Sequence, residues 1–297
     1  MDPRRRALLA AIAAGAASRR AFAQMPLISK KIPSTGEALP AIGLGTWQSF
    51  DARADTPALR EVMKAFSAGG GRVVDSSPMY GAAESVVGEL VEELALRGKL
   101  FLATKVWTSG RAEGIRQMET SFKRMRVQRM DLLQVHNLVD VDTHTRTLLE
   151  MKSAQKTRYI GITHYAASAH DEVERCLKAA QYDFLQINYS LGEPHADRRL
   201  LDLALERKVA VIANRPFAEG GMFRRVKGKA LPPWAAQLGI QSWAQYFLKW
   251  IVSHPAVTCA IPGTGNPEHM RDNLAACQGP LPDAAQRRRM AEYFEAL

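Results

Sequence analysis

Short apolar runs and amphipathic stretches alternate along most of this chain of 297 residues. The apolar runs are rich in β-branched residues, which is typical of strands buried on both faces. The stretches between them repeat apolar residues at helical spacing, as in 58–68, 85–96, 115–125 and 170–180. The apolar runs end near Thr46, Asp75, Lys105, His136, Thr163, Gln186, Asn214 and Pro262. Most of these ends are 23 to 31 residues apart, which is the length of one strand followed by one helix.

Eight such units predict an α/β fold of the (β/α)8 TIM-barrel type, because consecutive parallel strands with right-handed crossovers close into a barrel at that number. The competing fold is a doubly wound open sheet with a Gly-x-Gly-x-x-Gly turn. Gly43-Leu44-Gly45 is the nearest match to that turn, but Gln48 occupies the third glycine position. The barrel is therefore favoured. An N-terminal β-hairpin is predicted before it, over 27–40, from two short runs around a Pro-Ser-Thr-Gly-Glu turn.

The first 23 residues have the pattern of an export signal. Three arginines at 4–6 precede an alanine-rich apolar run at 7–17, and Ala21-Phe22-Ala23 forms a small-residue cleavage site before Gln24. The run is too short to span a bilayer, which needs about 20 residues. Paired arginines and a weakly hydrophobic run favour a twin-arginine signal peptide at 1–23 and a periplasmic protein. The alternative is a cytoplasmic protein whose N-terminal extension is never removed. Residues 24–297 are expected to form one barrel domain.

Composition argues against several other classes of protein. The net charge is +10, of which +4 lies in the first 23 residues, and no stripe of basic and aromatic residues predicts a nucleic-acid partner. Cys176, Cys259 and Cys277 are too widely spaced for a zinc site or a disulfide framework, so no metal is expected. A single Cys176–Cys277 disulfide stays open as an alternative in an oxidising compartment.

Four ionisable side chains stand at three consecutive strand ends. Asp75 and Tyr80 follow the second strand, Lys105 ends the third and His136 ends the fourth. The carboxyl ends of TIM-barrel strands face one mouth, so these groups are expected to share a pocket.

The four residues suit proton donation to a carbonyl group. A phenol has an ordinary pKa of about 10, and an ammonium group at Lys105 would lower the pKa of Tyr80. A buried lysine needs a counter-ion, which Asp75 would supply. His136 would hydrogen-bond the carbonyl oxygen and orient it. The set therefore predicts an acid and the groups that tune it, to be combined with a hydride source.

The same residues lie in four blocks that resemble the catalytic motifs of the aldo-keto reductase family. The blocks are Leu44-Gly45-Thr46-Trp47, Val74-Asp75-Ser76-Ser77-Pro78-Met79-Tyr80-Gly81, Thr104-Lys105-Val106-Trp107 and Leu133-Gln134-Val135-His136-Asn137. The resemblance implies that Tyr80 is the general acid/base, that Lys105 and Asp75 tune it, and that His136 polarises the carbonyl. It also implies hydride delivery from a nicotinamide. Trp47 and Trp107 would line the substrate pocket.

The resemblance extends to the nicotinamide end of a cofactor site. Thr46 in the first block belongs to it. Gln186 matches the glutamine that holds the carboxamide, and Thr163-His164 replaces the usual Ser-Asn pair beside it. Asn214 stands where the family has an aromatic residue that stacks on the nicotinamide.

The phosphate and adenosine end is implied by two further segments. Arg215 is placed to reach the pyrophosphate, and Phe217 lies in a stretch that resembles the loop over the phosphates. The last strand and the helix after it resemble the nucleotide segment, in which a helix start receives phosphate. The residues implied there are Gly263, Thr264, His269, Asp272 and Asn273.

The predicted function is NAD(P)H-dependent reduction of aldehyde or ketone carbonyls, on a small substrate and by a monomer. Family habit favours NADP(H) over NAD(H), although Gly263 and His269 replace two basic residues that often grip the 2′-phosphate. The changes at Asn214 and Gly263 leave an alternative, a nucleotide-binding barrel with a regulatory or structural role and little turnover. A hydrolase or an isomerase is not favoured, because the sequence contains no metal-ligand cluster and no nucleophile motif.

Overall fold

A computed structural model describes residues 27–51 and 56–297, so the predicted signal peptide at 1–23 lies outside the described residues. The predicted barrel is confirmed, because eight parallel strands follow one another in chain order within one sheet. Parallel bridges from Ile42 to Ala260 and from Gly45 to Gly263 join the first strand to the last. The strands are β3 (Leu44–Gly45), β4 (Val73–Asp75), β5 (Phe101–Val106), β6 (Met130–His136), β7 (Thr157–His164), β8 (Phe184–Asn188), β9 (Ala210–Asn214) and β10 (Val257–Ala260).

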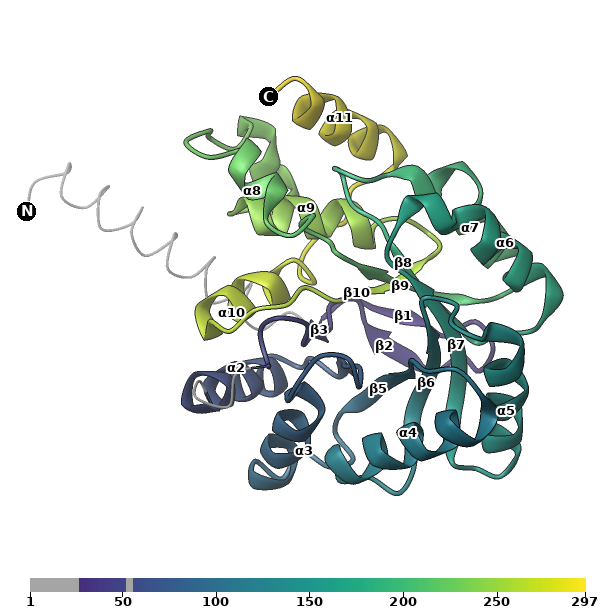
Figure 1. Cartoon of the computed structure of the whole chain (residues 1–297). Helices are drawn as coiled ribbons and strands as arrows, with labels where there is room; N and C mark the ends of the chain where they lie inside the picture. Colours follow the sequence, from purple (N-terminus) through teal and green to yellow (C-terminus); the bar gives the residue numbers. More distant parts are fainter. Residues whose placement is uncertain (1–26, 52–55) are drawn as a thin grey trace, which may run out of the picture.

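Helices surround the strands (Figure 1). The helices expected from the sequence are α2, α3, α4 and α6, and each begins within four residues of its predicted start. The long interval before the last strand contains α8 and a short 3-10 helix, η4. The helices are α2 (Thr56–Ala68), α3 (Ala83–Glu93), α4 (Arg111–Arg124), α5 (Val141–Ser153), α6 (His170–Ala179), α7 (Leu200–Glu206), α8 (Gly221–Arg225), α9 (Trp243–Val252), α10 (Pro267–Ala275) and α11 (Ala284–Glu295), with η2 (Ala167–Ala169), η3 (His195–Arg198) and η4 (Pro233–Leu238).

The predicted hairpin covers the N-terminal end of the barrel. Its strands β1 (Ser29–Lys31) and β2 (Ala38–Pro40) pair antiparallel. Ile32 and Leu39 are fully buried in the same apolar cluster as Phe101 and Tyr159, which lie near the starts of β5 and β7. The hairpin therefore fills the end of the barrel opposite to the mouth at which the strands finish.

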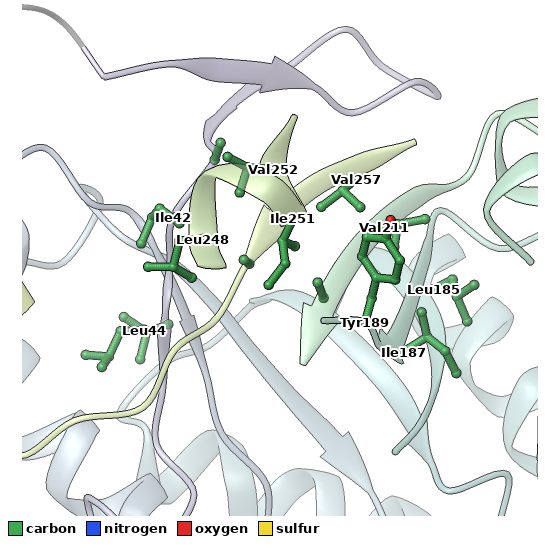
Figure 2. Packing of buried hydrophobic residues seen from close by; sticks show 14 of the residues in the cluster. Ile42, Leu44, Leu185, Ile187, Tyr189, Val211, Leu248, Ile251, Val252 and Val257 are labelled. Atoms are coloured by element: carbon green, nitrogen blue, oxygen red, sulfur yellow. The ribbon is translucent and has the colours of Figure 1, made fainter. Parts of the chain in front are cut away.

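The main apolar core lies between the strands and the helices. Figure 2 shows Leu248 and Ile251 of α9 beside apolar side chains from the barrel, among them Leu44. Every residue from 244 to 252 of α9 is buried, and a helix that is enclosed on all sides needs no polar face. Burying each large apolar side chain contributes about 1.5–3 kcal/mol, so this layer fixes the strand ends firmly.

The close approach of β3 to β10 requires glycine at position 45. A Cβ added to Gly45 would lie 2.7 Å from the carbonyl oxygen of Ile261, which is closer than a Cβ can come. The amide of Gly45 donates to the carbonyl of Pro262 at 3.1 Å. Because Thr46 follows directly, this contact sets where the chain enters the mouth.

The three cysteines are buried free thiols, so the Cys176–Cys277 disulfide that the sequence left open is not formed. Within 27–51 and 56–297, no helix is both long and apolar enough to cross a membrane. The same residues contain no group of three or more His, Cys, Asp or Glu side chains that could hold a metal ion.

Candidate active site

A cavity of about 750 Å³ opens at the carboxyl ends of the barrel strands. Twelve of the predicted site residues line it: Thr46, Trp47, Asp75, Tyr80, Trp107, His136, Thr163, Gln186, Asn214, Arg215, Phe217 and Gly263. Lys105 is fully buried beneath its floor. The structure therefore brings together strand ends that are far apart in the chain.

The floor of the cavity rests on a buried ion pair between β4 and β5. Lys105 Nζ donates to Asp75 Oδ2 at 2.7 Å and to the carbonyl oxygen of Ser76 at 2.7 Å. Burial alone would lower the pKa of Lys105, but the Asp75 carboxylate and the Tyr80 phenol outweigh it, and the pKa is raised. Lys105 is therefore a fixed positive charge under the cavity.

Tyr80 lies above this charge, with the centre of its ring 5.0 Å from Lys105 Nζ. The sequence predicts a lowered pKa for Tyr80, and the structure corrects this. Burial raises the pKa of Tyr80, and the opposing effect of the Lys105 ammonium is smaller. The phenol is therefore protonated in the resting protein, while the ammonium remains close enough to stabilise a phenolate that forms during a reaction.

Two glutamines, from β6 and β8, complete the surroundings of the Asp75 carboxylate. Gln186 Nε2 on β8 donates to Asp75 Oδ2 at 3.1 Å, and Gln134 Nε2 on β6 lies 3.4 Å from Asp75 Oδ1. Gln134 Nε2 also donates to Gln186 Oε1 at 2.8 Å. Both amide groups therefore help to satisfy the hydrogen-bonding capacity of the carboxylate that pairs with Lys105.

His136 at the end of β6 is 5% exposed and meets the edge of the Tyr80 ring, with ring centres 5.8 Å apart. Its Nδ1 lies 2.9 Å from Ser77 Oγ. Burial lowers the pKa of His136 to about 2, with further contributions from Lys105 and His164. The imidazole is therefore neutral at ordinary pH, and it can donate one hydrogen bond to a carbonyl oxygen without carrying a charge.

At the expected nicotinamide end of the cavity, the contacts of two residues differ from those that the sequence predicts. Gln186 lines the cavity, but both polar atoms of its amide already have partners in Asp75 and Gln134. Asn214 Nδ2 donates to the carbonyl oxygen of His164 at 3.3 Å, whereas its buried Oδ1 has no partner among the described residues. Asn214 therefore offers an unused acceptor at the position where the sequence resemblance implies an aromatic ring.

The side chains expected at the phosphate end of the cofactor site form ion pairs and hydrogen bonds within the protein. Arg215 Nη2 lies 3.2 Å from Glu219 Oε1, and its Nη1 donates to the carbonyl oxygen of Tyr165 at 3.3 Å. Asp272 accepts hydrogen bonds from the side chains of Ser242 and Gln245 at the start of α9. The predicted residues that do not line the cavity, apart from Lys105, are His164, Thr264, His269, Asp272 and Asn273. Their contacts with a nucleotide stay predictions.

Large apolar side chains surround the mouth. The described residues include seven large hydrophobic side chains that are exposed, and all except Leu149 and Leu205 line the cavity. The five at the mouth are Trp47, Met79, Trp107, Tyr165 and Phe223. Proteins rarely expose large apolar patches except where a ligand or partner binds. These five side chains therefore mark the entrance of a binding site.

The comparisons with known proteins agree with this geometry. Residues 41–290 match the aldo/keto reductase family. The methylglyoxal reductase YeaE of Escherichia coli (strain K12) is 30% identical over 267 residues, which cover 86% of this chain and 92% of that protein. An aldo/keto reductase from Klebsiella pneumoniae, crystallised with NADP and acetate, is 25% identical. It superposes with a TM-score of 0.75 over 87% of this chain and 93% of that chain. The methylglyoxal reductase DkgB of Salmonella typhi is 25% identical over 250 residues, which cover 80% and 87%.

The chain therefore belongs to the aldo/keto reductase family. The predicted barrel fold and the predicted class, an NAD(P)H-dependent oxidoreductase, are both confirmed.

Sequence reasoning missed several residues of the site. Ser77 contacts His136, Gln134 contacts Asp75, and Met79, Tyr165 and Phe223 form part of the mouth. The signal for Gln134 is present in the sequence, because a polar side chain inside the apolar run of β6 must find a buried partner. Ser77 and Tyr165 lie in turns, where the sequence does not show which way a side chain points.

The ion pair under the cavity makes a prediction about stability. Lys105→Met leaves the Asp75 carboxylate buried without its counter-ion, so the free energy of unfolding should fall by about 3–5 kcal/mol. The double variant Asp75→Asn/Lys105→Met removes both charges, so its free energy of unfolding should fall by less than that of Lys105→Met alone. Urea unfolding followed by tryptophan fluorescence measures these differences.

Lys64→Met is the matched control, because Lys64 pairs with Glu61 on the exposed face of α2 at 2.8 Å. An exposed pair contributes about 0–1 kcal/mol. A cost for Lys105→Met that is no larger than the cost for Lys64→Met would contradict the role given to the buried pair.

Proposed function

We propose that this protein reduces the carbonyl group of an aldehyde or ketone to an alcohol, with Tyr80 as the general acid and NADPH as the reductant. The observation that carries the proposal is the protonated Tyr80 phenol above the buried Lys105–Asp75 pair, next to a neutral His136. The complete set of four groups favours turnover over a barrel that only binds nucleotide.

The site residues divide the reaction into separate tasks. A bound nicotinamide supplies the hydride. His136 and Tyr80 hydrogen-bond the carbonyl oxygen, and the Tyr80 hydroxyl gives its proton to that oxygen as negative charge develops on it. The Lys105 ammonium stabilises the phenolate that remains on Tyr80, and Asp75 keeps Lys105 charged. The product is the alcohol.

The cavity has groups that suit a nicotinamide nucleotide. The unpartnered acceptor Asn214 Oδ1 could receive a carboxamide N–H, and Arg215 Nε is a buried donor without a partner among the described residues. A phosphate oxygen would satisfy that donor. The Klebsiella pneumoniae relatives crystallised with NADP or NADPH support NADP(H) over NAD(H).

Replacement of Tyr80 tests the proposed acid. NADPH oxidation with a carbonyl substrate, followed by absorbance, should be at least about 100-fold slower in kcat/KM for Tyr80→Phe, because general acid catalysis contributes about 10²–10⁴-fold. NADPH affinity, measured by fluorescence titration, should be unchanged. Tyr293→Phe on α11 is the control and should keep full activity. Full activity in Tyr80→Phe would remove Tyr80 from the acid role.

The apolar mouth supports an aromatic or otherwise apolar substrate. The charged residues at the cavity wall already have partners, since Asp75 pairs with Lys105 and Arg215 with Glu219. The remaining donor, Arg215 Nε, is assigned to a nucleotide phosphate, so a carboxylate on the substrate would find no further cation among these residues. Two relatives are named methylglyoxal reductases, and methylglyoxal has no ring or long apolar part with which to contact these side chains.

Truncation of Trp107 tests this substrate class. Gln117 on α4 holds the backbone of Trp107 through a hydrogen bond to its carbonyl, and the exposed indole lines the mouth. In Trp107→Ala, kcat/KM for benzaldehyde should fall about tenfold or more, while kcat/KM for methylglyoxal should change much less. Leu149→Ala removes an equally exposed apolar side chain away from the cavity and should change neither value. Equal losses for both substrates in Trp107→Ala would contradict an aromatic contact.

We also propose that residues 1–23 direct export through the twin-arginine route, on the basis of the arginine triplet and the Ala21-Phe22-Ala23 site. That route carries folded proteins, so the enzyme could leave the cytoplasm with its nucleotide bound. Mass spectrometry of the protein from its native host should find an N-terminus at Gln24. Lysines at positions 4–6 should block processing, whereas Arg19→Lys should not. A native protein that retains residues 1–23 would refute export.

A further inference from the structure

Ser77 is buried in the turn between Asp75 and Tyr80, and no part of its side chain is exposed. Its hydroxyl oxygen lies 2.9 Å from Nδ1 of His136 at the end of β6. The contact joins two strand ends, because Ser77 follows β4 whereas His136 ends β6. It is one of the few side-chain contacts of His136, so it bears directly on how the imidazole is oriented.

The surroundings of Ser77 indicate which partner carries the proton. The amide of Met79 donates to Ser77 Oγ at 3.4 Å, so an acceptor site of the hydroxyl is already in use. Among the described residues, His136 Nδ1 is the one group within hydrogen-bonding distance that could accept the Ser77 hydroxyl hydrogen. If His136 Nδ1 carried a proton instead, the buried serine hydrogen would have no acceptor, which costs about 1–3 kcal/mol. The favoured arrangement has Ser77 donating to Nδ1.

A neutral imidazole has one N–H, so an acceptor role for Nδ1 places the proton on Nε2. His136 lines the cavity and its ring meets the edge of Tyr80. We propose that Ser77 is a positioning residue that holds His136 in the Nε2–H tautomer, so that this N–H points to the oxygen of a bound carbonyl. The mechanistic part rests on the proposed carbonyl reduction, whereas the tautomer itself exists without turnover.

The tautomer decides whether His136 attracts or repels the carbonyl oxygen. With the proton on Nε2, the ring donates a hydrogen bond that strengthens as negative charge develops on the oxygen. With the proton on Nδ1, the lone pair of Nε2 would face the oxygen instead. A residue that orients a histidine through its second nitrogen therefore affects the reaction without touching the substrate.

Nitrogen NMR of the folded protein labelled with ¹⁵N-histidine measures the tautomer directly. In the wild-type protein, His136 Nε2 should resonate as a protonated nitrogen and Nδ1 as an unprotonated one. Ser76→Ala is the matched control: it removes an equally buried hydroxyl from the adjacent residue, which accepts a hydrogen bond from Thr46 and not from His136. This control should keep the wild-type pattern, whereas Ser77→Ala should show a mixture of tautomers or the reversed one.

A wild-type spectrum with the proton on Nδ1 would overturn the proposal, and it does not depend on whether any variant folds. An unchanged spectrum in a folded Ser77→Ala protein would overturn it as well. In kinetics, Ser77→Ala should lower kcat about tenfold or more, with the Kd for NADPH unchanged. Failure of the wild-type protein to reduce any carbonyl would refute the proposed function and leave the NMR result to stand alone.

Discussion

The site depends on one buried ion pair, between Lys105 on β5 and Asp75 on β4. Two charges are expensive to bury unless they lie close together and their remaining hydrogen-bonding capacity is satisfied. Here the carboxylate receives the ammonium and two amides, and the ammonium also donates to a backbone carbonyl. These contacts come from four different strands, so the pair can exist only when the barrel is closed.

The same pair separates the roles of the two groups above it. Tyr80 and His136 share one wall of the cavity, yet burial acts on them in opposite senses. It raises the pKa of the phenol, which keeps its proton, and it lowers the pKa of the imidazole, which stays uncharged. Lys105 adds to the effect on His136, since a second positive charge beside it is unfavourable. Burial thus produces an acid and a neutral hydrogen-bond donor side by side, and the Lys105 cation acts on both.

The expected cofactor side of the cavity departs from the sequence-based expectation more than the four ionisable groups do. Asn214 carries an amide whose oxygen has no partner among the described residues, and Arg215 pairs with Glu219. Gln186 supports Asp75 in addition to lining the cavity. In the proposed nucleotide site, Asn214 and Arg215 therefore offer hydrogen-bonding groups, and a phosphate that contacts Arg215 would share it with Glu219.

The sequence by itself determined the barrel, the hairpin and the meeting of four ionisable residues at one end of the barrel. Apolar runs reveal strands buried on both faces, and their spacing reveals the helices between them. Because TIM-barrel strands all present their carboxyl ends to one mouth, Asp75, Lys105 and His136 could be placed together from chain order alone. The sequence could not predict the contacts that side chains make across the barrel. The direction of the Tyr80 pKa depends on how much water burial removes, and the partners of Gln134 and Ser77 depend on side-chain directions inside a strand and a turn. Only the tertiary structure decided these, because each results from groups that meet after the strands have closed.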